Sequence, residues 1–286
     1  FVTAAHCTAA RITVVVRVGV TNLTKPEYIF ETNEWYNYPT YDDMQPLVVQ
    51  PNDISLLKLQ RRVVYSKLVQ PIRLQSSADA HRNYEGEVVY ASGHGRLWTL
   101  GATPEVLNWV YLRAVSNAAC ALNFGTTLIT ANAICARFFN VTSQSTCQGD
   151  SGGPLVHVDD AGTPVLIGVT SFVAGGDFGC HSGFPAGFIR TGPFHSWYQQ
   201  VTGIDFENFD EDDVTEAPEE EVTTKPPPTE SEEEDDDENS NEEDDSDEDP
   251  ELSELLKKLE VKVKVKVKVN KFKIKKKIHI KKKIPA

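Results

Sequence analysis

The sequence lacks long apolar runs and paired metal-ligand motifs. No stretch of about 18 or more apolar residues occurs, so we expect no membrane-spanning helix. None of the five cysteines stands in a Cys-x-x-Cys pair, and no group of histidines has the spacing of a metal site. The chain does not begin with Met, and no signal peptide is found in it. These absences argue against a zinc ribbon and predict a protein without metal or cofactor.

Acidic and basic residues are distributed unevenly along the 286 residues. Residues 1–204 hold 13 basic and 14 acidic side chains and are nearly neutral. Residues 205–250 hold 25 acidic side chains and one Lys, whereas residues 251–286 hold 14 Lys and 3 Glu. The first range has enough apolar residues for a large core, but the acidic range has few and repels itself. We therefore predict a domain over 1–204, a disordered acidic linker over 205–250 and a Lys-rich tail over 251–286.

The first range has the pattern of an all-β protein. Segments rich in β-branched residues, separated by Gly, Pro and Asn, predict short strands at 11–20, 54–59, 87–91, 107–114, 155–158 and 165–173. A helix is predicted at the end of the domain, where four side chains follow i, i+3, i+4, i+7 spacing: Phe194, Trp197, Tyr198 and Val201. Gly203 is expected to end this helix.

The charged tail has two patterns of its own. Four leucines form one face of a short amphipathic segment: Leu252, Leu255, Leu256 and Leu259. Residues 261–269 alternate Val and Lys, as a strand with one apolar face would. The Lys-rich end predicts attraction to anionic polymers or surfaces, unless the acidic block simply neutralises it. Nucleic acid is not an expected partner.

The strongest chemical motif is the hexapeptide GDSGGP at residues 149–154. A serine on a tight glycine-rich turn lets a substrate carbonyl approach Ser151 closely. The backbone N–H groups of Gly149 and Ser151 are then free to donate to a developing oxyanion. The motif therefore predicts nucleophilic catalysis by Ser151.

A serine nucleophile needs a base, and the base needs an orienting carboxylate. His6 lies among small residues in the segment TAAHC, and Asp53 opens an apolar segment in which it would be buried. Asp42 and Asp43, in a loop rich in Tyr and Pro, are the alternatives to Asp53.

The segments FVTAAHC, NDISLLKL and CQGDSGGPL together resemble the three catalytic signatures of the chymotrypsin/trypsin family, in the family's order along the chain. The resemblance covers about residues 1–204. It implies a fold of two six-stranded antiparallel β-barrels, the first incomplete here, with a C-terminal helix. It also implies that Ser151 attacks the peptide bond, that His6 acts as base and then acid, and that Asp53 fixes the imidazole tautomer.

Four residues match positions of the family's substrate pocket: Ser145, Ser171, Val173 and Ala186. Ser145 matches the floor, where a neutral side chain cannot balance a substrate Lys or Arg. Val173 should narrow the pocket, and Ser171 should also support Asp53. Residues 179–190 resemble arthropod chymotrypsins and collagenases. The resemblance thus implies an endopeptidase that cleaves after apolar or aromatic residues, with protein substrates and protein inhibitors as partners of a monomer.

The resemblance also pairs cysteines, Cys120 with Cys135 and Cys147 with Cys180. Cys7 matches a family cysteine whose partner lies upstream of the catalytic His, so we expect it to be unpaired here. Disulfides imply an extracellular, secreted protein. If the protein is secreted, two triplets are acceptors for N-glycosylation, at Asn22 and Asn140.

Two features depart from the family. In the family, a new N-terminal amine pairs with the Asp before the nucleophile, which is Asp150 here. No matching segment is present, so Asp150 is expected to be an unpaired buried charge. His94 stands between two glycines where the family usually has Trp, which predicts altered packing. The alternatives to an active endopeptidase are therefore a non-catalytic homologue that acts as a secreted binding or regulatory protein, or a record of only part of the chain.

Overall fold

The computed structural model describes residues 1–175 and 179–208. The leucine-rich segment, the Val–Lys alternation and most of the predicted acidic linker lie outside these residues. The described elements are almost all strands, joined by turns and three short helices. The prediction of an all-β fold is therefore confirmed.

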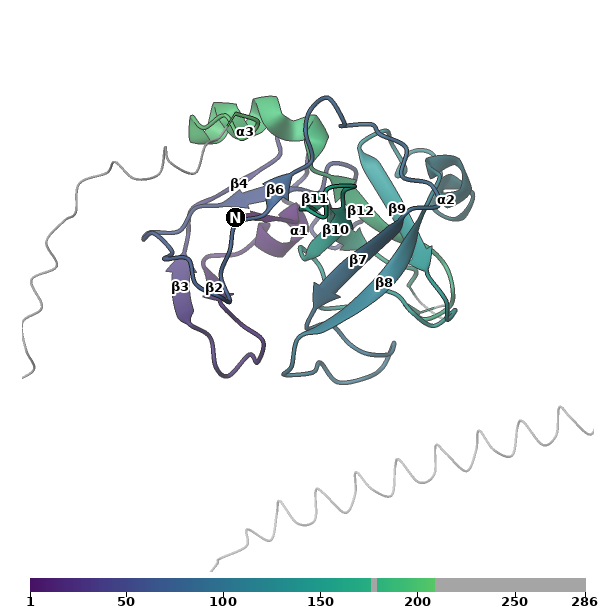
Figure 1. Cartoon of the computed structure of the whole chain (residues 1–286), viewed down its shortest axis with the longest axis horizontal. Helices are drawn as coiled ribbons and strands as arrows, with labels where there is room; N and C mark the ends of the chain where they lie inside the picture. The colour runs from purple at the N-terminus through teal and green to yellow at the C-terminus, as the bar shows by residue number, and fades with distance from the viewer. Residues whose placement is uncertain (176–178, 209–286) are drawn as a thin grey trace, which may run out of the picture. The chain divides into compact units, whose positions relative to one another are not determined.

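A closed six-stranded antiparallel barrel forms the second half of the domain (Figure 1). Its strands are β7 (Val88–Gly93), β8 (Asn108–Val115), β9 (Ala133–Phe138), β10 (Pro154–Val158), β11 (Pro164–Phe172) and β12 (Ala186–Arg190). They pair in the order β10-β7-β8-β9-β12-β11, and β11 pairs with β10 to close the ring. The short strand β6 (Arg73–Leu74) adds to β11 in parallel.

The first half of the domain is a partial barrel, as predicted. One sheet contains β1 (Val2–Thr3), β5 (Ser55–Leu57) and β4 (Trp35–Asn37). A separate hairpin contains β2 (Val14–Val18) and β3 (Tyr28–Thr32). The strand expected at 11–20 is shorter than predicted, because Gly19 has a φ of +68° and so leaves the extended region.

Three helices accompany the strands. The predicted C-terminal helix is α3 (His195–Thr202), preceded by the 3₁₀ turn η1 (Gly192–Phe194), and it ends at Gly203 in the left-handed conformation. Two helices were missed, α1 (Ala5–Thr8) and α2 (Asn117–Phe124). Ser116 caps the N-terminus of α2, since its side chain accepts a hydrogen bond from the backbone N–H of Ala119. None of the described helices is long and apolar enough to cross a membrane.

Two apolar clusters hold the two halves in place. One fills the closed barrel with buried side chains from all six of its strands, among them Val89, Leu112, Ile134, Leu155, Ile167 and Phe188. The other packs α3 against the first half and includes Ala4, Ile54, Val169, Ile189, Trp197 and Tyr198. Because the second cluster includes residues next to His6 and Asp53, the packing of α3 also fixes the backbone at these two residues.

Candidate active site

His6 and Asp53 form a direct pair. β1 and β5 pair in antiparallel register, with Thr3 opposite Ser55, so the residues just outside these strands come together. His6 Nδ1 lies 2.6 Å from Asp53 Oδ2, and the backbone N–H of His6 donates to Asp53 Oδ1 at 2.8 Å. Asp53 is 3% exposed. The apolar segment that begins at Asp53 buries this carboxylate, as predicted. Hydrogen bonds from His6 satisfy both carboxylate oxygens.

A third hydrogen bond reaches Asp53 from the second half of the domain. Ser171, in β11, donates its hydroxyl to Asp53 Oδ2 at 2.5 Å. The two alternative carboxylates bind elsewhere: Asp42 accepts the N–H of Met44, and Asp43 accepts the side-chain amide of Asn37. With Nδ1 held by Asp53, the free lone pair of the neutral His6 ring is on Nε2.

The surroundings of His6 favour its protonated form. Burial alone would lower its pKa, but the hydrogen bond to Asp53 and a hydrogen bond with Cys7 outweigh burial, and the pKa rises from 6.5 to about 10. The charges of both partners act in the same direction. Cys7 is a free, half-buried cysteine, as expected, and its influence on His6 was missed at the level of sequence.

The turn that carries Ser151 packs on the segment that carries His6. Gly152 has a φ of +77°, and a Cβ there would overlap Thr3 Oγ1 and lie 3.2 Å from the backbone N of Ala4 and 3.3 Å from Cys7 Sγ. Ser151 itself is exposed. Across residues 1–175 and 179–208, no hydrogen bond joins Ser151 Oγ to His6 Nε2. The serine turn and the His–Asp pair therefore meet at one site, with the hydroxyl open to solvent.

The backbone N–H groups that were predicted to donate to the oxyanion make no hydrogen bonds among the described residues. Gly149 has a φ of +102° and is exposed, as is Ser151. Among the described residues, no hydrogen bond uses the N–H of either one, although the neighbouring Asp150, Gly152 and Gly153 all donate to backbone carbonyls. These two N–H groups are thus available to an anionic oxygen.

Among the described residues no ion pair to Asp150 is found, but its carboxylate is half-buried rather than buried, and it is hydrogen-bonded. It accepts the backbone N–H of Gly95 at 2.8 Å and that of Cys147 at 2.9 Å. A Cβ at Gly93 or Gly95 would overlap this carboxylate. The two glycines around His94 were therefore the signal in the sequence: they make room for Asp150 and supply a donor to it.

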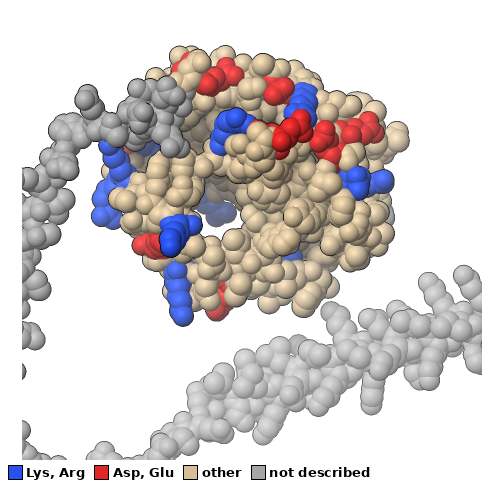
Figure 2. Space-filling view, viewed as in Figure 1, with Lys and Arg blue, Asp and Glu red and all other residues tan. Residues whose placement is uncertain are grey.

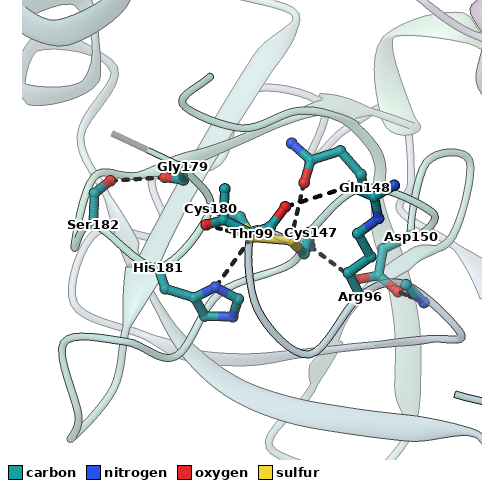
Figure 3. The surroundings of a disulfide bond; sticks show 10 residues. Arg96, Thr99, Cys147, Gln148, Asp150, Gly179, Cys180, His181 and Ser182 are labelled. Atoms are coloured by element: carbon teal, nitrogen blue, oxygen red, sulfur yellow. Dashed lines mark hydrogen bonds between the residues drawn. A yellow bond between two sulfur atoms is a disulfide. The ribbon is translucent and has the colours of Figure 1, made fainter. Parts of the chain in front are cut away.

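Both predicted disulfides are present, Cys120–Cys135 and Cys147–Cys180. The second ties the serine loop to the segment after β11, and Figure 3 shows the His181 ring directed at it, with Nδ1 3.2 Å from Cys180 Sγ. Cys147, Cys180 and His181 are also the group of potential metal ligands found in the described residues. Because the two sulfurs are bonded to each other, they do not offer the thiolates that such a site would need.

The pocket residues differ in their access to solvent. Ser145 and Val173 are half-buried. Ala186 was expected to line a pocket wall, but it is 0% exposed and belongs to the barrel core, against which Val173 packs. The reason is that the side chain of Ala186, in β12, packs within the apolar cluster that fills the closed barrel. Ala186 therefore lines no open pocket in this structure.

Comparisons with known proteins agree with this architecture. Residues 1–198 match the family model described as Trypsin. The chain is 34% identical over 204 residues to the collagenase of Hypoderma lineatum, covering 71% of this chain and 73% of that protein. It is 30% identical over 201 residues to chymotrypsin-2 of Vespa crabro, covering 69% and 83%. The solved structure of HL collagenase has a TM-score of 0.61 and 33% identity, covering 71% of this chain and 82% of that one. The chain belongs to the trypsin family of serine proteases.

Proposed function

We propose that the protein is a secreted endopeptidase that hydrolyses peptide bonds with Ser151 as nucleophile, His6 as general base and Asp53 as the orienting carboxylate. The observation that carries the proposal is the hydrogen bonding of Asp53, which accepts both donors of His6 and the hydroxyl of Ser171. This arrangement leaves His6 Nε2 as the atom that can take a proton. The packing of Gly152 on the His6 segment supports the assignment of Ser151.

The proposed reaction follows from these roles. Ser151 Oγ attacks the substrate carbonyl carbon while its proton passes to His6 Nε2, and Asp53 stabilises the imidazolium that forms. The N–H groups of Gly149 and Ser151 donate to the oxyanion. His6 then protonates the departing amine, which leaves an acyl-enzyme at Ser151. Water, activated by His6 in the same way, releases the acid and restores the serine.

The proposed substrates are peptides with an apolar or aromatic residue before the cleaved bond. Ser145 is neutral, so a buried substrate Lys or Arg would have no counter-ion there. Val173 adds apolar volume beside the barrel core. The names of the relatives include collagenase, chymotrypsin, elastase and trypsin, so the family alone does not decide between these preferences.

The test is covalent labelling of the purified protein with a fluorophosphonate, followed by peptide mapping and assays with substrates that differ only in the residue before the cleaved bond. We expect the label on Ser151 and faster cleavage after Phe or Leu than after Arg. Ser151→Ala should lower kcat by about 10⁶-fold, the effect of removing a serine nucleophile. Ser143→Ala, at an exposed serine in the same loop, is the matched control and should leave kcat unchanged.

A second candidate is a non-catalytic homologue that binds a partner. It is favoured by one observation, the lack of a hydrogen bond between Ser151 and His6 among the described residues. A folded, disulfide-bonded protein that gives neither adduct nor hydrolysis would establish this candidate instead. Ser151→Ala would then leave partner binding unchanged.

A further inference from the structure

A strip of exposed and half-buried aromatic side chains runs along the outer face of the closed barrel. β8 alternates between the core and the surface, with Leu112 fully buried and its neighbours Trp109 and Tyr111 63% and 47% exposed. The rings of Trp109 and Tyr111 lie 4.9 Å apart, and Tyr111 also contacts Tyr90 of β7 at 6.5 Å and Phe139 at 6.3 Å. We call these four residues the aromatic strip.

Few charged side chains lie over the aromatic strip. Figure 2 shows that the surface over β7 and β8 carries few charged side chains. Arg113 lies at the strip, with its guanidinium 4.8 Å from the centre of the Phe139 ring, and the exposed Arg137 pairs opposite it on the same face. Large apolar patches on the surface of a soluble protein usually mark a site that something else covers.

One end of the strip leads directly into a glycosylation triplet. Phe139 is followed by Asn140, Val141 and Thr142, all three of which are exposed. The turn after Asn140 is closed by Gln144, whose side-chain oxygen accepts the N–H groups of Asn140 and Val141, and whose own N–H donates to Val141 O. Among the described residues, the side-chain amide of Asn140 makes no hydrogen bond. It is therefore free for modification without loss of a native contact.

The second triplet is placed differently. Asn22 is half-buried, and its side-chain oxygen accepts both the N–H and the hydroxyl of Thr24, at 2.9 and 2.6 Å. Its backbone also forms a β-bridge with Val106. Asn22 is thus part of a tied-down connection between the two halves, whereas Asn140 lies on a free surface turn.

We propose that Asn140 carries an N-linked glycan and that the inner sugars of this glycan cover the aromatic strip. The proposal rests on the secretion that is part of the proposed function, but not on catalysis. Sugar rings present a face of C–H groups, which pack well on aromatic rings, and Phe139 is the residue next to the attachment point. The occupant of the strip is then a group attached to the chain itself.

The modification uses the ordinary chemistry of the secretory pathway. Asn140 Nδ2 forms a bond to C1 of the first N-acetylglucosamine of a lipid-diphosphate-linked oligosaccharide. The bond from C1 to the diphosphate breaks, the lipid diphosphate leaves with the electron pair, and the amide loses one proton to solvent. Thr142 supplies the hydroxyl that the triplet requires.

The first measurement is glycopeptide mass spectrometry of the full chain, directed into the secretory pathway of a eukaryotic host, with both secreted and cell-retained protein analysed. We expect the peptide that contains Asn140 to carry a glycan. A peptide amidase specific for N-glycans should then convert the side-chain amide of Asn140 to a carboxylate, which the mass of the peptide reveals. Asn140→Gln and Thr142→Ala should both lose this glycan, and Asn22→Gln should keep it. An unmodified Asn140 in the wild-type chain overturns the proposal.

The second measurement tests whether the glycan covers the strip. We expect the unfolding temperature of the glycosylated wild type to be about 2–4 °C above that of Asn140→Gln. A contact with an aromatic face contributes about 1 kcal/mol, which corresponds to a shift of this size for a domain of about 200 residues. In a Tyr111→Thr background, which keeps a strand-forming residue in β8 but removes the ring that contacts the other three, the difference should be clearly smaller. An undiminished difference in this background, or no difference in the wild type, overturns the covering of the strip. Both results are independent of hydrolytic activity, so they do not depend on the catalytic proposal.

Discussion

Asp53 accepts hydrogen bonds from His6 and from Ser171, residues that the sequence places 47 and 118 positions away. The carboxylate is nearly inaccessible to water, so hydrogen bonds from these partners must replace the hydrogen bonds to water that it loses on burial. Cys7, the neighbour of His6, adds a further influence on the imidazole. At the residue scale, the state of the candidate active site is thus decided by His6 and the groups that hold its proton.

Activity and stability should both change with pH because of His6. A general base must be neutral, and the pKa of His6 is raised from 6.5 to about 10, so kcat/KM should increase with pH up to about 10. The stabilisation from the protonated His6 is fully present below pH 6.5, the unfolded value, and is lost as pH rises through about 10. Rate profiles and urea unfolding across this range check both statements. In His6→Gln, the free energy of unfolding should lack this part of the pH dependence. A kcat/KM that stays constant between pH 6.5 and about 10 would contradict the predicted rise in activity.

Replacement of Cys7 should separate the two influences on His6. Cys7→Ala removes the side chain whose hydrogen bond helps to raise the pKa of His6, while the pair with Asp53 remains. We expect the rise of kcat/KM with pH to move to lower pH, with little change in its maximum. Titration of the His6 ring by NMR in both proteins would measure the shift directly. An unchanged His6 titration would show that Asp53 alone sets the pKa.

At the element scale, the turn at residues 149–153 and the segment from β1 to α1 fit together through glycine. Gly152 adopts a backbone conformation that L side chains rarely take, and it faces Thr3 and Cys7. Gly93 and Gly95 have ordinary backbone angles, but a Cβ at either one would overlap the carboxylate of Asp150. Missing side chains at these places let backbone segments approach each other closely, which brings Ser151 to the site of His6.

Gly152→Ala should therefore reduce activity by more than its effect on stability suggests. A left-handed alanine costs about 1–2 kcal/mol, and the overlap with Thr3 also pushes the serine turn away from His6. A displacement of about 1 Å lowers the rate by about 100-fold. The control is Gly86→Ala, where φ is +87° and nothing lies within 4 Å, so it should carry the conformational cost without the loss of rate. Equal kcat/KM values in the two variants would contradict the role of Gly152.

The sequence predicted the elements and residues whose signals are local. The motifs around His6, Asp53 and Ser151 and the β-branched strands could be recognised because each occupies a few adjacent residues. The helix α2 was missed although Ser116 marks its start, because within it only Cys120 is buried and so no apolar stripe appears. The contact between Gly95 and Asp150 and the burial of Ala186 were not predicted, since each joins residues about 50 or more positions apart in the sequence, although the glycines around His94 hinted at the first.

At the scale of the whole molecule, the described domain is nearly neutral, and almost all of the net charge belongs to residues 205–286. The first part of this range is strongly acidic and the last part is rich in Lys. Interactions that depend on charge are therefore expected to belong to the tail, whereas the proposed hydrolysis belongs to the domain.

Binding to a sulfated polysaccharide should separate these roles. We expect the full chain to be retained through residues 251–286, weakly and only at low salt, because exposed charges are screened at higher ionic strength. Removal of residues 251–286 should abolish retention without changing kcat/KM for a short peptide. Removal of residues 209–250 should strengthen retention, since fewer carboxylates then compete for the Lys side chains. Retention that survives removal of residues 251–286 would exclude the Lys-rich end as the binding element.

The hydrogen bonds of Asp53 also determine when in the life of the chain an active centre can exist. His6 comes from α1 and Ser171 from β11, 47 and 118 residues away from Asp53 in the sequence. Contacts between residues so far apart form late in folding, because long loops must close first. A chain still emerging from the ribosome holds His6 and Asp53 long before Ser151 and Ser171 have been made. The proposed protease activity would therefore be absent during synthesis and most of folding, so the cell that makes the protein would not be exposed to it at those stages.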